Sequence, residues 1–102
     1  MPALDQLLPL LDANPDDAFA RYAVAMEYAR QSRLDEALAQ FTELLRRHPD
    51  YVPGYFMAGR TARQKGDVES AKSFLKTGIA AAQRAGDRHA VDEMTEALEM
   101  LE

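Results

Sequence analysis

Two consecutive stretches of this chain carry related residues at corresponding places, 34 residues apart. Pro15 and Asp16 recur as Pro49 and Asp50. Seven further pairs at the same offset match in size or chemistry: Tyr22 with Phe56, Ala25 with Gly59, Leu34 with Val68, Asp35 with Glu69, Ala37 with Ala71, Phe41 with Leu75, and Leu45 with Ile79. A fixed period of this length indicates one supersecondary unit that is copied along the chain and stacked on itself. The period therefore restricts the fold to a stack of repeats.

Composition, three turn signals and the repeat period together predict six helical segments. Ala and Leu dominate and β-branched residues are few, which favours helix throughout. The run 14–17 should end one helix and start the next, with Asp16 as the capping residue and Asp17 beside the positive helix end. Gly66-Asp67 and Gly86-Asp87 carry the same stop-and-start signal. The predicted helices span residues 3–13, 17–31, 34–47, 50–65, 68–84 and 88–101.

The unit resembles the tetratricopeptide repeat, a helix–turn–helix of 34 residues with fixed small, aromatic and proline positions. Counted from Ala18, positions eight, eleven, twenty, twenty-four and thirty-two hold Ala25, Tyr28, Ala37, Phe41 and Pro49. Counted from Val52, positions four, eight, twenty and twenty-four hold Tyr55, Gly59, Ala71 and Leu75, the last as a variant. The chain departs from the family pattern at Arg21, where an aromatic is usual, at Ala62 and at Gln83.

The resemblance implies an all-α fold, an α-solenoid of antiparallel helix pairs that forms a single domain. Two repeats would be flanked by an N-terminal half-repeat helix and a C-terminal capping helix. The expected divisions are residues 1–14, 15–49, 50–84 and 85–102. A polar outer face on the last helix suits a cap, because a stack of repeats must end on a soluble surface.

The first predicted helix is the second half of a unit whose first half is absent. Ala3, Leu7 and Pro15 stand one period ahead of Ala37, Phe41 and Pro49. Pro9 lies inside this helix and removes a backbone donor, so we expect a kink or a late start. The half-unit fits either a natural cap or a segment of a longer array.

Two features of the first helices predict how they pack. Between Ala18 and Ala29 only Arg21 and Glu27 are charged, and a helix this apolar should be covered on more than one side or present an apolar strip. Gly59 costs roughly 1 kcal/mol against Ala inside a helix, so a close helix crossing should explain its presence.

Charge and composition argue against several partner classes. The net charge of −5 disfavours nucleic acid, because phosphate binding requires clustered Lys and Arg. No apolar run approaches the length of a membrane span. The chain has no cysteine, and its N-terminus lacks the basic start of a secretory signal, so the cytoplasm is the default expectation.

No residue pattern predicts catalysis, a metal or a cofactor. His48 and His89 lie far apart in the repeat frame, with no third ligand type beside either. The acidic residues of the last helix lack the alternating ligands and central glycine of a calcium loop, so we expect a solvated face: Asp92, Glu93, Glu96 and Glu99. We therefore expect a protein that is not an enzyme and that uses no cofactor.

The resemblance also implies where a ligand would lie. The family lines its concave face with first helices, chiefly at repeat positions two, five, nine and twelve. Those positions hold Phe19, Tyr22, Met26 and Ala29, then Pro53, Phe56, Arg60 and Arg63, with Ala90 and Met94 continuing the strip. The candidate peptide-binding residues are Phe19, Tyr22, Met26, Phe56, Arg60, Arg63 and Met94. The alternative is that the aromatic residues only pack against neighbouring helices.

Met26 and Arg60 are the better candidates among these residues. Methionine suits adaptable binding surfaces, and arginine binds carboxylates with a fork of donors. A familiar subclass of the family grips the C-terminal carboxylate of a chaperone with Lys at position five and Asn at position nine. Tyr22 and Met26 stand there in the first repeat, so that ligand class is not expected.

Two functional hypotheses remain. The first is a protein–protein interaction module, a scaffold that holds a peptide or helix of a partner in a concave groove, with Arg60 and Arg63 meeting an acidic group. The second is a self-assembling structural unit, in which the apolar strip or an end helix closes a homodimer or stacks in a longer array. The apolar excess on the first helices favours the groove.

Overall fold

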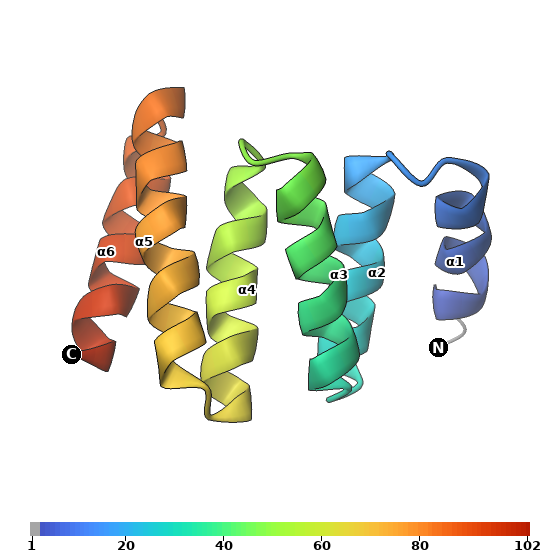
Figure 1. Ribbon diagram of the computed structural model, residues 1–102, viewed down its shortest axis with the longest axis horizontal. Coiled ribbons are helices and arrows are strands. Elements are labelled where there is room, and N and C mark those ends of the chain that lie inside the picture. Colours follow the sequence, from blue (N-terminus) through green and yellow to red (C-terminus); the bar gives the residue numbers. More distant parts are fainter. Residues whose placement is uncertain (1–2) are drawn as a thin grey trace.

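Six helices make up the protein in a computed structural model that describes residues 3–102. They are α1 (Ala3–Ala13), α2 (Ala18–Arg30), α3 (Leu34–Arg47), α4 (Val52–Lys65), α5 (Val68–Ala85) and α6 (Arg88–Leu101). Figure 1 shows them side by side in chain order, with α1 at one end of the row and α6 at the other. The predicted all-α class is confirmed, and residues 3–102 contain no strand.

The helices form two layers. Each helix packs against the next in sequence, and in addition α2 contacts α4 and α4 contacts α6. In Figure 1, α2 and α6 lie behind α3 and α5. The helices α2, α4 and α6, here called the inner layer, therefore share one face of the stack. None of the described helices is long and apolar enough to cross a membrane.

Aspartates cap three of the helices. Asp17, Asp67 and Asp87 each accept a backbone N–H from three residues ahead, at 3.0, 3.1 and 3.0 Å. The prediction that Asp16 caps α2 is wrong, because Asp17 holds the extended backbone of a capping residue, with φ −74° and ψ 103°. Asp16 instead lies near the end of α3, where its carbonyl is 3.0 Å from His48 Nε2.

Residues with a left-handed backbone follow three of the helices. Gly66 and Gly86 adopt φ values of 94° and 71° directly after α4 and α5, as glycines in this position commonly do. The equivalent turn in the first repeat places Ser32 at φ 62°, a conformation that is costly for a residue with a Cβ.

The N-terminal helix has its predicted bounds, and one of the two effects expected of Pro9 is absent. It begins at Ala3, ahead of Pro9, so the late start is not observed. Pro9 cannot donate a hydrogen bond to the Asp5 carbonyl, four residues back. Both residues are exposed, so water can satisfy that carbonyl.

Two clusters form the core, and α2 lies between them. Leu4 and Leu11 of α1 pack with Ala20 and Val24 of α2 in a small cluster, while the other side of α2 joins a larger cluster that extends through α3 to α6. Cover from both sides explains why α2 carries so few charged residues, as the sequence predicted.

Glycines permit two close helix crossings. A Cβ at Gly59 would stand 3.0 Å from Leu75 Cδ2 and 3.6 Å from the Ala71 carbonyl, so the predicted crossing of α4 and α5 is confirmed. Gly78 of α5 is tighter still. A Cβ there would collide with Tyr55 Cβ of α4 and stand 2.6 Å from Met94 Sδ of α6. The 34-residue period did not single out Gly78, because the residue one period earlier is Leu44.

The side chain at position four of each repeat donates a hydrogen bond to the carbonyl of the preceding proline, although the donor is a phenol in one repeat and a guanidinium in the other. Tyr55 Oη donates to the Pro49 carbonyl at 2.8 Å, and Arg21 Nη2 donates to the Pro15 carbonyl at 2.9 Å. Arg21 is only 9% exposed, and its Nη1 donates to Gln40 Oε1 at 2.8 Å. The departure from an aromatic at Arg21 therefore keeps the contact to the preceding proline.

Candidate partner-binding groove

A cavity of about 190 Å³ opens across the inner layer. Tyr22 of α2 lines one side and α4 lines the centre, while α6 and its capping residue line the other side. The residues from α4 are Val52, Pro53, Phe56 and Met57, and those from the α6 side are Asp87, His89, Ala90, Glu93 and Met94. This cavity, here called the inner groove, is mainly apolar and aromatic at its centre, as expected of a ligand site.

Aromatic packing holds Tyr22, on one side of the inner groove, in place. The Tyr22 ring meets Phe41 edge-on, with centroids 6.3 Å apart, and lies 5.4 Å from the Tyr51 ring. Burial raises the pKa of the Tyr22 hydroxyl above its usual range, and the neighbouring Tyr51 adds to this. Tyr22 thus remains a neutral side chain that both packs and lines the groove.

Further along α4, two arginines border a second and smaller cavity. Arg60 and Arg63 line a pit of about 70 Å³ whose other walls are apolar: Gly59, Leu75, Ala97, Met100 and Leu101. They also border an open hollow beside Gln64. At about 1.5 Å per residue, Arg63 lies roughly 10 Å beyond Phe56 along the helix axis. We call this region the arginine end.

The charged residues beside the two cavities have different partners. Within residues 3–102, no carboxylate lies within 4.0 Å of the guanidinium of Arg60 or Arg63. The two arginines therefore have no carboxylate partner in the described part of the chain. Beside the inner groove, Asp87 accepts a backbone N–H and caps α6, and the 3.5 Å contact between Glu93 and His89 is an ion pair only when the imidazole is protonated.

The structure brings together some of the predicted residues and separates others. Tyr22, Phe56 and Met94 meet at the inner groove, although Met94 is completely buried and shapes the groove from beneath. Arg60 and Arg63 are exposed together at the arginine end. Two predicted residues line neither cavity: Phe19, which is 72% exposed, and Met26, which packs against the larger core cluster.

Sequence reasoning missed His89 and Glu93 at the rim of the groove. These residues stand where Tyr55 and Gly59 stand one period earlier, and in α4 both of those positions are buried against α5. In α6 the same positions are exposed. The repeat period relates these positions along the helix, but only the packing decides which of them reach the groove.

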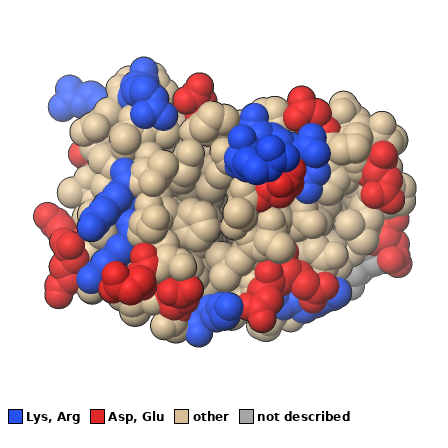
Figure 2. Space-filling view, viewed as in Figure 1, with Lys and Arg blue, Asp and Glu red and all other residues tan. Residues whose placement is uncertain are grey.

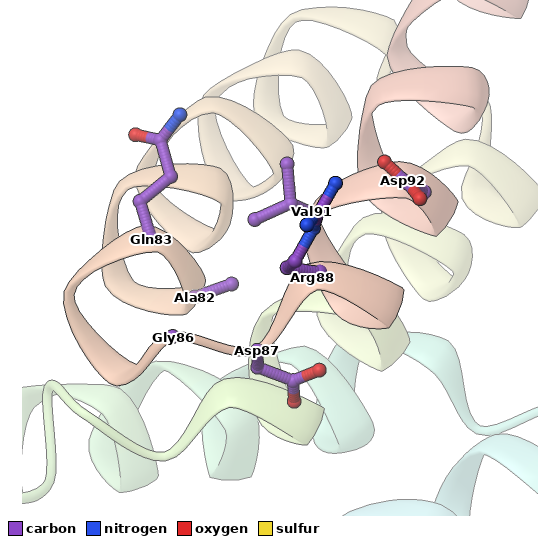
Figure 3. Close-up of a pocket in the computed structure, with 7 residues that line it drawn as sticks. All are labelled: Ala82, Gln83, Gly86, Asp87, Arg88, Val91 and Asp92. Carbon is purple, nitrogen blue, oxygen red and sulfur yellow. The ribbon is translucent and has the colours of Figure 1, made fainter.

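A shallow cleft at the turn between α5 and α6 lacks the aromatic lining of the inner groove. It has a volume of about 340 Å³ and is lined by seven residues around Gly86. Figure 3 shows Ala82 and Val91 pointing toward each other across it, with Gln83 and Asp87 pointing away. Asp87 already caps α6, and the other polar residues that line the cleft are exposed: Gln83, Arg88 and Asp92.

The face of the molecule formed by α3 and α5 carries charges of both signs. Figure 2 shows blue and red side chains interspersed around its margin and uncharged side chains across its middle. Several of the basic residues are paired, as in the 2.6 Å contacts from Glu43 Oε2 to Arg46 Nη2 and Arg47 Nε. Within residues 3–102, no three His, Asp or Glu side chains come together as a metal site would require.

Comparisons with known proteins agree with this geometry. A family model described as tetratricopeptide repeat matches residues 1–65. The TPR repeat-containing protein PA0015 of Pseudomonas aeruginosa is 25% identical over 99 residues, which cover 97% of this chain and 94% of that protein. The solution NMR structure of a tetratricopeptide repeat domain protein from Salinibacter ruber has a TM-score of 0.81 at 31% identity, over 87% of this chain and 90% of that one.

A further solved structure shares the fold at low identity. The crystal structure of PcrH in complex with the chaperone binding region of PopD has a TM-score of 0.91 at 17% identity, over 97% of this chain and 75% of PcrH. Because the family model spans well over half of the sequence, the chain belongs to the tetratricopeptide repeat family.

Proposed function

We propose that this protein is a non-catalytic protein-interaction module that holds a segment of a partner protein in the inner groove. The observation that carries the proposal is the cavity of about 190 Å³, with apolar and aromatic walls supplied by three helices. Phe56 and Met57 keep part of their surface exposed there, so an apolar side chain of a partner would gain burial by entering. PcrH, which shares this fold, was solved with a segment of a partner protein, and this supports the same use here.

An acidic group of the partner would meet Arg60 and Arg63. Both guanidinium groups lie on the inner layer beyond the groove and are free of carboxylates within the described chain. An arginine presents a planar fork of donors that matches a carboxylate. These residues would thus orient a partner that the apolar groove anchors.

Filling the groove tests the proposal. Ala90 is half-buried on the α6 wall, so Ala90→Phe should occupy the cavity with the protein's own side chain. The matched control is Ala80→Phe, at an exposed position of α5. Short peptides enriched from a random display library should bind the wild type and Ala80→Phe, and should lose binding to Ala90→Phe. Unchanged binding to Ala90→Phe in a protein that melts normally would refute the groove.

A second candidate is a homodimer, favoured by exposed apolar side chains outside the groove. Leu10 and Phe19 are 59% and 72% exposed, and a second copy would remove this surface from water. The test is molar mass by light scattering across protein concentrations. A dimer that Phe19→Glu converts to monomer would favour this candidate, whereas a constant monomer mass would eliminate it.

A further inference from the structure

The two cavities on α4 differ in the size of the group that they admit. The inner groove holds about 190 Å³ and the pit at the arginine end holds about 70 Å³. The pit therefore favours a smaller apolar side chain than the inner groove does. The groove admits an aromatic or long aliphatic one. A partner that fills both must therefore carry two apolar side chains of unequal size.

Charge distinguishes the two cavities as well. The walls of the pit include Arg60 and Arg63 and no acidic residue, whereas Asp87 and Glu93 border the inner groove. The whole chain has a net charge of −5, so its overall field repels an acidic partner. Any preference for an acidic residue must then arise locally, from the two arginines.

We infer, as a refinement that rests on the proposed function, that the partner segment carries three recognition groups in line. A large apolar side chain would enter the inner groove. About 10 Å further along, a small aliphatic side chain would enter the pit, and a neighbouring carboxylate would meet Arg60 and Arg63. That separation corresponds to about three residues of an extended segment or about seven residues of a helix.

Variants that alter one cavity at a time test the three groups separately. Ala97→Leu fills the pit without changing a charge, and Ala80→Leu is its control at an exposed position of α5. Arg60→Gln with Arg63→Gln removes the charges. Its control is Lys76→Gln with Arg88→Gln, two exposed cations that line neither cavity. Random display libraries are selected on the wild type and on each variant, and the enriched peptides are sequenced.

We expect each variant to enrich peptides that lack a different one of the three recognition groups. Wild-type peptides combine a large apolar residue with an acidic residue and a small aliphatic residue at the stated separation. Selection on Ala97→Leu drops the small aliphatic residue and keeps the acidic one. Selection on the arginine double variant drops the acidic residue. That variant also binds a wild-type peptide about tenfold more weakly at low ionic strength, equivalent to about 1.4 kcal/mol, and added salt narrows the difference.

Two other outcomes would contradict these expectations, and they can be told apart. Peptides that lose binding to Ala90→Phe but show no acidic preference, or that ignore the arginine double variant, would overturn this inference together with the proposed role of Arg60 and Arg63. The proposed binding of a partner segment in the inner groove would still stand. Peptides that bind Ala90→Phe as well as the wild type would overturn both.

Discussion

Gly78→Ala adds a single methyl group at the point where α5 passes between α4 and α6. The new Cβ would collide with Tyr55 Cβ, which is fixed to the backbone of α4 and cannot rotate away. It would also stand 2.6 Å from Met94 Sδ, at the end of a flexible side chain that can move. The clash with Tyr55 therefore requires α4 and α5 to separate.

Two opposing contributions set the magnitude. Replacing glycine by alanine inside a helix stabilises by roughly 1 kcal/mol, whereas overpacking a core typically costs about 1–3 kcal/mol. A backbone-anchored clash belongs at the upper end of that range, so we expect the free energy of unfolding to fall by about 2 kcal/mol. For a domain of this size, such a loss lowers the Tm by roughly 8–16 °C.

Gly59→Ala is the matched control on the same pair of helices. Its Cβ would stand 3.0 Å from Leu75 Cγ and Cδ2, and the leucine can shift by a few tenths of an ångström. The gain in helix propensity should then offset the crowding, leaving this variant within about 1 kcal/mol of the wild type. Thermal and urea unfolding followed by far-UV circular dichroism measure both variants. A Gly78→Ala protein as stable as Gly59→Ala would refute the crossing geometry.

Three further changes have defined expected outcomes. Ser32→Gly should raise the free energy of unfolding by about 0.5–1 kcal/mol, because it relieves a positive φ at the place where Gly66 stands in the next repeat; an unchanged urea midpoint would contradict this. Hydrogen bonds from Arg46, and to a smaller extent from Arg47, lower the pKa of Glu43 to about 2. The ionised Glu43 side chain therefore stabilises the fold above the unfolded-state pKa of about 4.3, and this stabilisation is lost as the pH falls toward about 2. Glu43→Gln should therefore flatten the dependence of Tm on pH between about 5 and 2, and an identical profile in the variant would contradict the assignment. Deleting 88–102 removes the completely buried Met94 and uncovers α5, which should abolish cooperative unfolding; a monomeric deletion variant with an unchanged Tm would show that α6 is not a structural cap.

Local signals made the helices predictable from the sequence. Gly66 and Asp67 end one helix and cap the next whatever lies around them, and the structure has both roles. The one capping prediction that failed chose Asp16 over Asp17. Composition cannot separate two adjacent aspartates, because the backbone angles of each residue decide which one caps.

The candidate site was less predictable, because exposure depends on packing between helices. Met26, Arg60 and Met94 occupy the same repeat position, yet Arg60 is exposed and Met94 is completely buried. Gly78 accounts for the difference at Met94, since the space left by its missing side chain is where the Met94 sulfur lies. No period in the sequence reveals that one residue's burial depends on a glycine in another helix.

The hydrogen bond at position four has a consequence for how such a chain can be lengthened. Both bonds, from Arg21 to Pro15 and from Tyr55 to Pro49, reach back only six residues. Each is contained in one 34-residue stretch, so an inserted copy would bring its own donor and its own acceptor. An extra copy of residues 49–82 placed after residue 82 would thus join the stack without borrowing this contact from a neighbour. The position tolerates both a phenol and a guanidinium, so a designer could choose its charge freely as long as the side chain reaches the proline carbonyl.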